Sequence, residues 1–86
     1  MLVQLDNVNI GVIGLGYVGL PLAVEFGKKF PTVGFDINTS RVEELIQGHD
    51  FTLEVSSDEL ASATHIQYSA DVSKLSDCNV YIVTVP

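Results

Sequence analysis

The chain has 86 residues and a mass of 9.3 kDa, which allows one domain or part of one. Hydrophobic residues make up 47% of it and charged residues 17%, a composition that favours a packed core over intrinsic disorder. Four basic residues against eleven acidic ones give a net charge of −7, so we expect neither nucleic acid nor an anionic membrane surface as a partner.

The cysteine count and the length of the first apolar run bear on the cellular compartment of the protein. Cys78 is the single cysteine, so an internal disulfide is excluded, and no Cys or His cluster has the spacing of metal ligands. The first apolar run is far shorter than the roughly 20 residues of a membrane span, and no Lys or Arg precedes it. We therefore expect a cytoplasmic protein without a metal.

The first part of the chain predicts a strand, a turn and a helix. Asn9–Ile13 is a short β-branched run typical of a buried parallel strand, and it leads into a glycine-rich turn. A helix is predicted from Val18 to about Lys29, with Pro21 in its first turn. Its expected buried face comprises apolar residues three to four positions apart: Val18, Leu22, Ala23, Phe26 and Phe30.

A second strand and a second helix follow. Thr32–Phe35 predicts the strand, which ends at Asp36, and the helix is expected from about Ser40 to Gln47. Asn38, Thr39 and Ser40 can each cap this helix, and Ser40 with Glu43 has the spacing of a capping box. The expected buried stripe is Val42, Leu45 and Ile46, and Gly48 is the expected stop.

The rest of the chain carries weaker signals until its end. A loop is predicted over His49–Ser57, a short helix over Ser57–Ala63 with Ser56 or Ser57 as its cap, and a short strand over Ile66–Tyr68. Val80–Val85 is almost wholly β-branched or aromatic, which predicts a strand buried on both faces.

Three glycines and one acid form the motif that carries chemistry. Strand, Gly14-x-Gly16-x-x-Gly19, helix, strand and then Asp36 is the order of a dinucleotide-binding βαβ unit. Gly14 permits the tight turn, Gly16 lets the backbone approach a diphosphate, and Gly19 lets the helix pack on the strand. One alternative is a tight turn without a ligand. Another is a methyltransferase, although its loop is usually G-x-G-x-G.

Asp36 and Arg41 bear on the choice of cofactor. A carboxylate at the end of the second strand accepts hydrogen bonds from the adenosine ribose and repels a 2′-phosphate, which favours NAD over NADP. An arginine nearby can instead accommodate that phosphate. Because Asp36 would then face the phosphate unpaired, we interpret Arg41 as packing near the adenosine.

Other polar residues have no assigned role. Cys78 has no histidine near it in sequence, and His49 and His65 lie in loop-like segments. We see no acid–base or nucleophile–base pair, so no catalytic residue is expected in this chain. The remaining acids are expected on solvated faces: Glu43, Glu44, Glu54, Asp58 and Glu59.

The glycine loop and its flanks resemble one family in particular. Gly14–Ala23, Gly34–Asn38 and Arg41 are similar to the signature of the UDP-glucose/GDP-mannose dehydrogenase family, and the Tyr-Val pair before Gly19 is its discriminating detail. Val83–Pro86 resembles the start of that family's Val-Pro-Thr-Pro segment. Leu20–Lys28 is most similar to the UDP-N-acetylhexosamine 6-dehydrogenases within it, as is Thr52-Leu53-Glu54.

This resemblance implies a fold, a cofactor and a set of site residues. The implied fold is α/β, the first half of a Rossmann dinucleotide-binding fold, with a parallel sheet and helices on both faces. The family oxidises the C6 alcohol of a nucleotide sugar to a carboxylate with two NAD, and its catalytic residues have no counterpart here. The cofactor residues that carry over are Gly14, Leu15, Gly16, Tyr17, Val18, Gly19, Asp36, Arg41, Thr84 and Val85.

The length suggests that the chain is part of a longer enzyme. One βαβαβ half of a dinucleotide-binding fold accounts for residues 1–86, so we expect a partial amino-terminal NAD-binding domain that is not catalytic by itself. The exposed edge of a half-sheet would favour self-association, and we expect a homo-oligomer. The alternatives are a free-standing NAD-binding regulatory module and another NAD-dependent oxidoreductase with the same first half.

Overall fold

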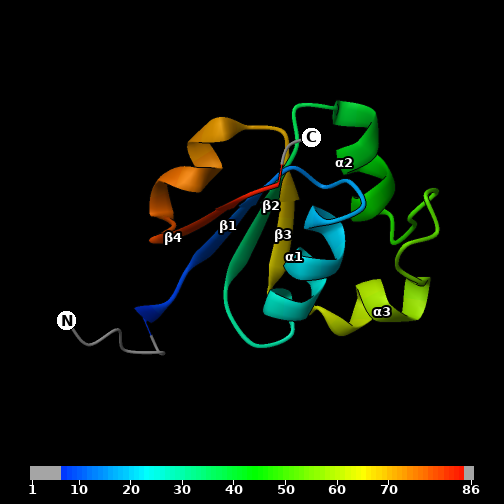
Figure 1. Cartoon of the computed structure of the whole chain (residues 1–86), viewed down its shortest axis with the longest axis horizontal. Coiled ribbons are helices and arrows are strands. Elements are labelled where there is room, and N and C mark those ends of the chain that lie inside the picture. Colours follow the sequence, from blue (N-terminus) through cyan, green and yellow to red (C-terminus); the bar gives the residue numbers. More distant parts are fainter. Residues whose placement is uncertain (1–6, 85–86) are drawn as a thin grey trace.

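Strands and helices alternate along the part of the chain that this computed structural model describes, residues 7–84 (Figure 1). In chain order they are β1 (Ile10–Ile13), α1 (Gly19–Gly27), β2 (Thr32–Phe35), α2 (Thr39–Ile46), α3 (Ser57–Ser62), β3 (Ile66–Ser69), the 3₁₀ helix η2 (Val72–Asp77) and β4 (Val80–Val83). Every strand and α-helix in this order was predicted from the sequence, whereas η2 was not.

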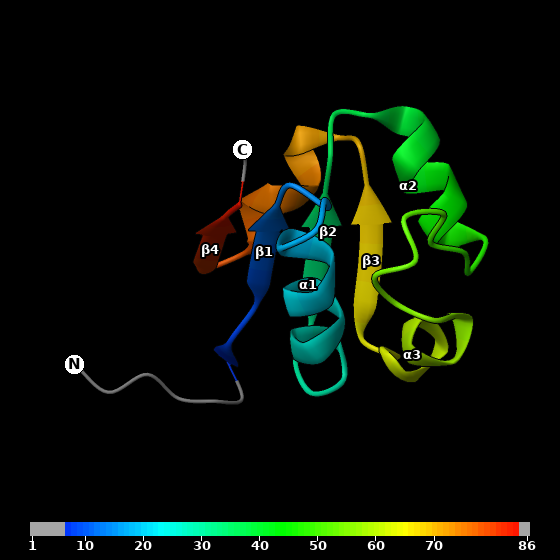
Figure 2. The same cartoon turned by 45° about the vertical axis from the view of Figure 1, so that its right-hand side comes forward.

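The four strands form one parallel sheet in the order β3-β2-β1-β4. Ile13 at the end of β1 is in register with Phe35 of β2 on one side and with Val83 of β4 on the other. Helix α1 covers one face of the sheet and η2 the opposite face (Figure 2). The predicted fold class is therefore confirmed, and the segments that follow β1, β2 and β4 meet at one edge.

Helix α1 packs on the sheet through a face that matches the predicted one only in part: Ala23 is buried, and Phe26 and Phe30 pack against the core as expected. Val18 is 63% exposed and Leu22 is 37% exposed, so neither belongs to the core. A Cβ on Gly27 would lie 2.8 Å from Cβ of Ile66, which shows how closely the helix approaches β3. Small residues create this approach, and the buried face is Gly19, Leu20, Ala23, Val24 and Gly27.

Helix α2 begins at an asparagine cap. The Asn38 side chain accepts a hydrogen bond from the Arg41 amide at 3.2 Å, and the Asn38 amide donates to Asp36 at 2.9 Å. The predicted capping box at Ser40 and Glu43 is therefore wrong. The acid that ends β2 orients the asparagine two residues later, and this local bond favours Asn38 as the start of the helix.

Two further expectations for the middle of the chain have different outcomes. Ser56 caps α3 as predicted, by accepting a hydrogen bond from the Glu59 amide at 3.2 Å. Val42 and Leu45 are buried as expected, but Ile46 is 63% exposed. Helix α2 is short and only one narrow side of it faces the core, so Ile46 points away.

Strand β4 is an edge strand, and the expectation that it is buried on both faces is wrong. Tyr81 is 51% exposed and Val83 is 62% exposed. The strand pairs only with β1 among the described residues, so its other edge has no neighbour to cover it. A continuous β-branched run shows that a strand is apolar on both faces, but it does not show whether other elements cover them.

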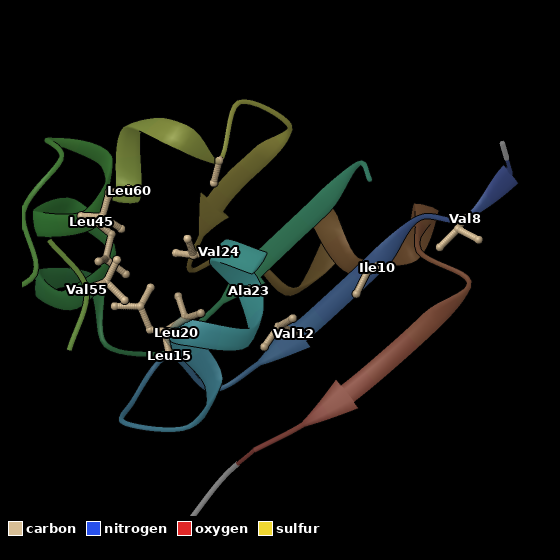
Figure 3. Close-up of a cluster of buried hydrophobic side chains, with 11 residues drawn as sticks. Val8, Ile10, Val12, Leu15, Leu20, Ala23, Val24, Leu45, Val55 and Leu60 are labelled. Carbon is tan, nitrogen blue, oxygen red and sulfur yellow. The ribbon is translucent and has the colours of Figure 1, made fainter. Parts of the chain in front are cut away.

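The core lies between the sheet and the helices on one face (Figure 3). Leu15, which lies between two glycines of the turn, is fully buried and packs with the side chains that α1, α2 and α3 contribute. The core is thus continuous with the glycine loop, and the conformation of the loop is fixed from inside the protein. The other members are Val8, Ile10, Val12, Leu20, Ala23, Val24, Leu45, Val55, Leu60 and Ala63.

Candidate dinucleotide-binding site

A large cavity in residues 7–84 lies at the carboxyl ends of β1, β2 and β4. Its volume is about 630 Å³, and its lining is mostly apolar. This is the place where open parallel sheets bind ligands. It is lined by Ile13, Gly14, Leu15, Gly16, Tyr17, Val18, Phe35, Asp36, Ile37 and Thr84.

The three glycines differ in what surrounds them. Gly14 has φ of +101°, a conformation that a side chain rarely adopts, and its amide donates to the Phe35 carbonyl at 2.8 Å. A Cβ on Gly19 would collide with the Gly14 carbonyl and the Thr84 hydroxyl. A Cβ on Gly16 would have no protein atom within 4 Å. Gly14 and Gly19 are therefore required by the fold, whereas no contact in the described residues requires a glycine at Gly16.

The start of α1 offers a backbone amide to an anion. Val18 occupies the N-cap position and makes no side-chain capping bond. The Leu20 amide donates to the Gly16 carbonyl at 3.1 Å and Pro21 has no N–H, so Gly19 is the first-turn residue whose amide can meet an anion. Tyr17 and Val18 are 71% and 63% exposed at the mouth of the cavity. An uncapped helix start beside exposed apolar groups fits a ligand that combines a diphosphate with flat rings.

Asp36 lies at the end of β2, where it lines the cavity as predicted. One of its carboxylate oxygens accepts from the Leu15 amide at 3.0 Å, and the other accepts from the Asn38 amide at 2.9 Å. Each carboxylate oxygen has two lone pairs, so both keep the capacity to accept from another donor such as a ribose hydroxyl. The two amides fix the direction in which the carboxylate points.

Thr84 joins the end of β4 to the glycine loop. Its hydroxyl lies 2.8 Å from the Gly14 carbonyl oxygen and 3.2 Å from that of Ile13, and its amide donates to Ile13 at 2.9 Å. Thr84 therefore holds the turn and lines the cavity, and its contact with the cofactor stays a prediction. Val85, expected there too, lies outside the described residues.

Arg41 does not line the cavity, although it was predicted to contact the adenosine. Its Nε donates to the Leu15 carbonyl at 2.9 Å, and its Nη1 lies 2.7 Å from Asp50 and 3.2 Å from Glu44. In this structure the side chain supports the loop through Leu15. A direct contact between Arg41 and the ribose stays a prediction.

Asp50 is an important residue that the sequence analysis missed. Its side chain is fully buried, and it accepts hydrogen bonds from four groups in the loop that follows: the Thr52 amide and hydroxyl and the Glu54 and Val55 amides. Burial raises its pKa, but the bonds from Thr52, Arg41 and Val55 outweigh burial and lower the pKa to about 2. The Asp-x-Thr spacing typical of an Asx turn was the available signal.

The remaining candidates lie apart from the cavity. His49 and His65 are exposed. Burial raises the pKa of the half-buried Cys78 thiol. Glu44 was expected to be solvated, but its side chain is only 14% exposed because it pairs with Arg41. Within residues 7–84, no group of three acidic, His or Cys side chains could hold a metal ion.

Comparison with known proteins shows where this site belongs. Residues 8–86 match the UDP-glucose/GDP-mannose dehydrogenase family, NAD binding domain. The chain belongs to this family. The match confirms both the resemblance seen in the sequence and NAD as the cofactor of the domain.

Individual members of the dehydrogenase family are similar over nearly the whole chain. UDP-N-acetyl-D-glucosamine 6-dehydrogenase of Salmonella typhi is 51% identical over 95% of the chain, and the enzyme of the same name in Pseudomonas aeruginosa is 55% identical over 95%. The solved structure of UDP-D-ManNAc dehydrogenase from Pyrococcus horikoshii has a TM-score of 0.77 with 31% identity over 91% of the chain.

The same comparisons define how much of such an enzyme is present. The chain spans 19% of the length of the two curated relatives and 20% of the archaeal structure. Within the described part of this family member, no helix has the length and apolar character needed to cross a membrane.

Proposed function

We propose that this chain supplies the NAD-binding part of a nucleotide-sugar 6-dehydrogenase. The observation that carries the proposal is the bare backbone at Gly16, which faces the cavity beside the carboxylate of Asp36. Two relatives named UDP-N-acetyl-D-glucosamine 6-dehydrogenase share half or more of its residues, which supports a UDP-N-acetylhexosamine as the sugar.

The proposed reaction converts the C6 alcohol of the sugar to a carboxylate. For each alcohol, two NAD⁺ and one water are consumed, and one carboxylate, two NADH and three protons are formed. NAD⁺, when bound, supplies the hydride acceptor. The groups that act on the sugar are expected outside residues 7–84, because the described part of the chain holds no acid–base pair at the cavity.

Each residue of the site has a proposed role in holding the dinucleotide. Gly16 admits the diphosphate, and the Gly19 amide at the start of α1 donates to it. Asp36 accepts from the adenosine ribose hydroxyls, while Leu15 and Gly14 set the shape of the loop. Tyr17, Val18 and Thr84 border the cavity, and Val85 is proposed to continue its wall.

Calorimetric titration with NADH and NADPH tests this function. We expect NADH to bind at least about ten-fold more tightly than NADPH, because Asp36 repels a 2′-phosphate. Asp36→Asn should weaken NADH binding about ten-fold through the loss of a charged acceptor. It should also reduce the difference in affinity between NADH and NADPH. Asp58→Asn, which removes the same charge from the exposed face of α3, is the control and should change neither affinity. Tighter binding of NADPH by the unaltered chain would contradict the proposal.

We also propose that the chain self-associates and that the protein is cytoplasmic. The outer edge of β4 leaves backbone groups without a partner strand in the described residues, which favours pairing with a second copy. Light scattering should show an average mass that rises with protein concentration. Val83→Lys, which places a charge on the exposed strand, should reduce the rise; a constant monomer mass would count against self-association. The cytoplasm is proposed because it supplies NAD and keeps Cys78 reduced.

A further inference from the structure

Two large apolar side chains project from the loop between α2 and α3, which forms the right-hand side of the molecule in Figure 1. Phe51 is 76% exposed and Leu53 is 88% exposed. A single exposed apolar residue is ordinary in a folded protein, but several on one loop are a mark of a surface that binds another group. We refer to Phe51 and Leu53 as the loop surface.

The backbone of this loop is held in place by hydrogen bonds. The buried carboxylate of Asp50 accepts from the Thr52 amide at 3.0 Å and from the Glu54 amide at 2.9 Å. These bonds lie on either side of Leu53, whose own amide donates to the Asp50 carbonyl at 3.1 Å. A partner of the loop surface therefore meets an ordered loop, and binding costs little conformational entropy.

The backbone conformation of Leu53 is unusual for its residue type. Its φ is +61°, in the left-handed region that glycine and asparagine adopt more readily than leucine. At 88% exposure the side chain contributes little packing to the described part of the chain. The fold of this chain therefore explains neither the choice of leucine nor its exposure, and such strained residues cluster at sites where something binds.

Acidic groups border the loop surface. A hollow of about 250 Å³ separates the loop from the first turns of α1, and the acids that line it are Glu25, Glu54 and Glu59. Lys28 lies 3.1 Å from Glu25 and 3.0 Å from Glu59, whereas Glu54 has no basic partner among residues 7–84. A partner that covers the loop surface is therefore complementary in charge when it presents a basic side chain to Glu54.

The charge of the chain disfavours a second copy as this partner. A two-fold contact brings the same surface of both copies together, so the two Glu54 carboxylates would face each other. The net charge of −7 adds to the repulsion. The chain spans 19% of the length of the two curated relatives, so most of such an enzyme lies outside it and can supply the partner.

We propose that the loop surface is a docking site for a segment of the same dehydrogenase that lies outside this chain. The segment presents apolar side chains to Phe51 and Leu53 and a basic side chain to Glu54. Pro21 in the first turn of α1 also lines the hollow, so the docked segment lies beside the helix that begins at the glycine loop. The inference rests on the proposed function, because it requires the chain to work as part of a longer enzyme.

The experiment compares the isolated chain with the same chain in a full-length enzyme. In a chimera, the chain replaces the 82 matching residues of UDP-N-acetyl-D-glucosamine 6-dehydrogenase of Pseudomonas aeruginosa. Leu53→Asn in the isolated chain should leave the midpoint of urea denaturation unchanged or raise it, because asparagine tolerates the left-handed conformation. In the chimera the same change removes an apolar contact, and the melting temperature should fall by about 2 °C or more.

Fluorescence shows directly whether the loop surface is covered. The chain has no tryptophan, so Phe51→Trp introduces a single indole into the isolated chain. Its emission there should be that of an indole in water. In the chimera, the difference spectrum between Phe51→Trp and the unaltered chimera should lie at shorter wavelength, because the docked segment removes the indole from water. Emission at the same wavelength in both proteins would overturn the inference.

Two further variants complete the comparison. Val72→Asn replaces an apolar residue of η2 that is 67% exposed at the opposite face of the sheet, and it should change the melting temperature of the chimera by less than about 1 °C. Glu54→Lys should lower the melting temperature of the chimera more than that of the isolated chain, because it repels the basic side chain of the segment. Equal changes in the two proteins would overturn the basic partner of Glu54.

The unaltered chimera reports on the proposed function. If it lacks NAD-dependent dehydrogenase activity, the proposed function is contradicted and the inference falls with it. In an active chimera, docking alone is overturned if Leu53→Asn leaves the melting temperature unchanged, if Val72→Asn lowers it equally, or if Leu53→Asn also destabilises the isolated chain. A Leu53→Asn chimera that does not fold is the extreme of the expected loss, and the emission of Phe51→Trp then decides.

Discussion

Gly19→Ala is expected to destabilise the chain and to abolish most of its NADH binding. The new methyl group would collide with the Gly14 carbonyl, which belongs to the backbone of the turn, and with the Thr84 hydroxyl that holds it. The helix, the turn or both must move, and overpacking of this kind lowers the free energy of unfolding by about 1–3 kcal/mol. Because the same turn shapes the cavity, we expect NADH affinity to fall about ten-fold or more. Urea denaturation and calorimetric titration measure the two effects.

Gly16→Ala is the matched comparison, because it adds the same methyl group three residues earlier. Its Cβ would meet no protein atom within 4 Å, so the free energy of unfolding should change by less than about 0.5 kcal/mol. NADH affinity should still fall about ten-fold, since the methyl group stands where a diphosphate approaches the backbone. Full NADH affinity in Gly16→Ala would show that the dinucleotide does not lie against this residue.

Asp50→Ala is expected to have the largest effect on stability. It would leave the buried guanidinium of Arg41 without its closest partner and three loop amides without their acceptor, and breaking a buried pair in this way costs about 3–5 kcal/mol. That is a large fraction of the stability of a chain of 86 residues, about 4–13 kcal/mol. Urea denaturation followed by circular dichroism measures the loss.

Asp71→Ala is the control, since Asp71 makes the same local turn. Asp50 accepts from the amide and hydroxyl of Thr52, and Asp71 accepts in the same way from Ser73. Asp71 is exposed and has no arginine partner in the described residues, so its replacement should cost far less. Equal losses in the two variants would show that the turn, and not the buried pair, explains the effect of Asp50.

The pH dependence of stability provides an independent measurement of the same group. The folded pKa of Asp50 is lowered from 3.8 to about 2, so the unfolded chain binds the proton first as the pH falls. The stabilisation is therefore complete above about pH 4, and about 2 kcal/mol of it is lost by pH 2. A free energy of unfolding that stays constant from pH 5 to pH 2 would contradict the buried charged pair.

The sequence predicted the parts of the fold that rest on local patterns. The turn after β1 and the end of β2 were predicted at the right positions, because one turn and one strand impose the spacing of Gly14, Gly16, Gly19 and Asp36. The strands were found from short apolar runs, and parallel order followed from the alternation with helices. These signals depend on residues that are neighbours in sequence, so one sequence was enough to predict the strands and the turn.

The parts that were missed depend on individual contacts that a residue pattern does not show. Asn38 was one of three candidate caps of α2, and periodicity cannot show the bond from its amide to Asp36 that favours it over Ser40. Arg41 was recognised as important, but its partner Asp50 carried only the signal of a turn. The exposure of Val83 depends on what lies beside β4, and no property of the strand itself reveals it.

The bond from Thr84 to Gly14 makes assembly of the site a late event in folding. The two residues are 70 positions apart, and the hydroxyl of the later one holds the carbonyl of the earlier one. During synthesis, the glycine loop therefore cannot reach its final conformation until Thr84 has been made, which is at the end of the described chain. A dinucleotide that binds the finished loop also favours the docked position of β4, so the cofactor stabilises a strand that has a neighbour on only one side in the described structure.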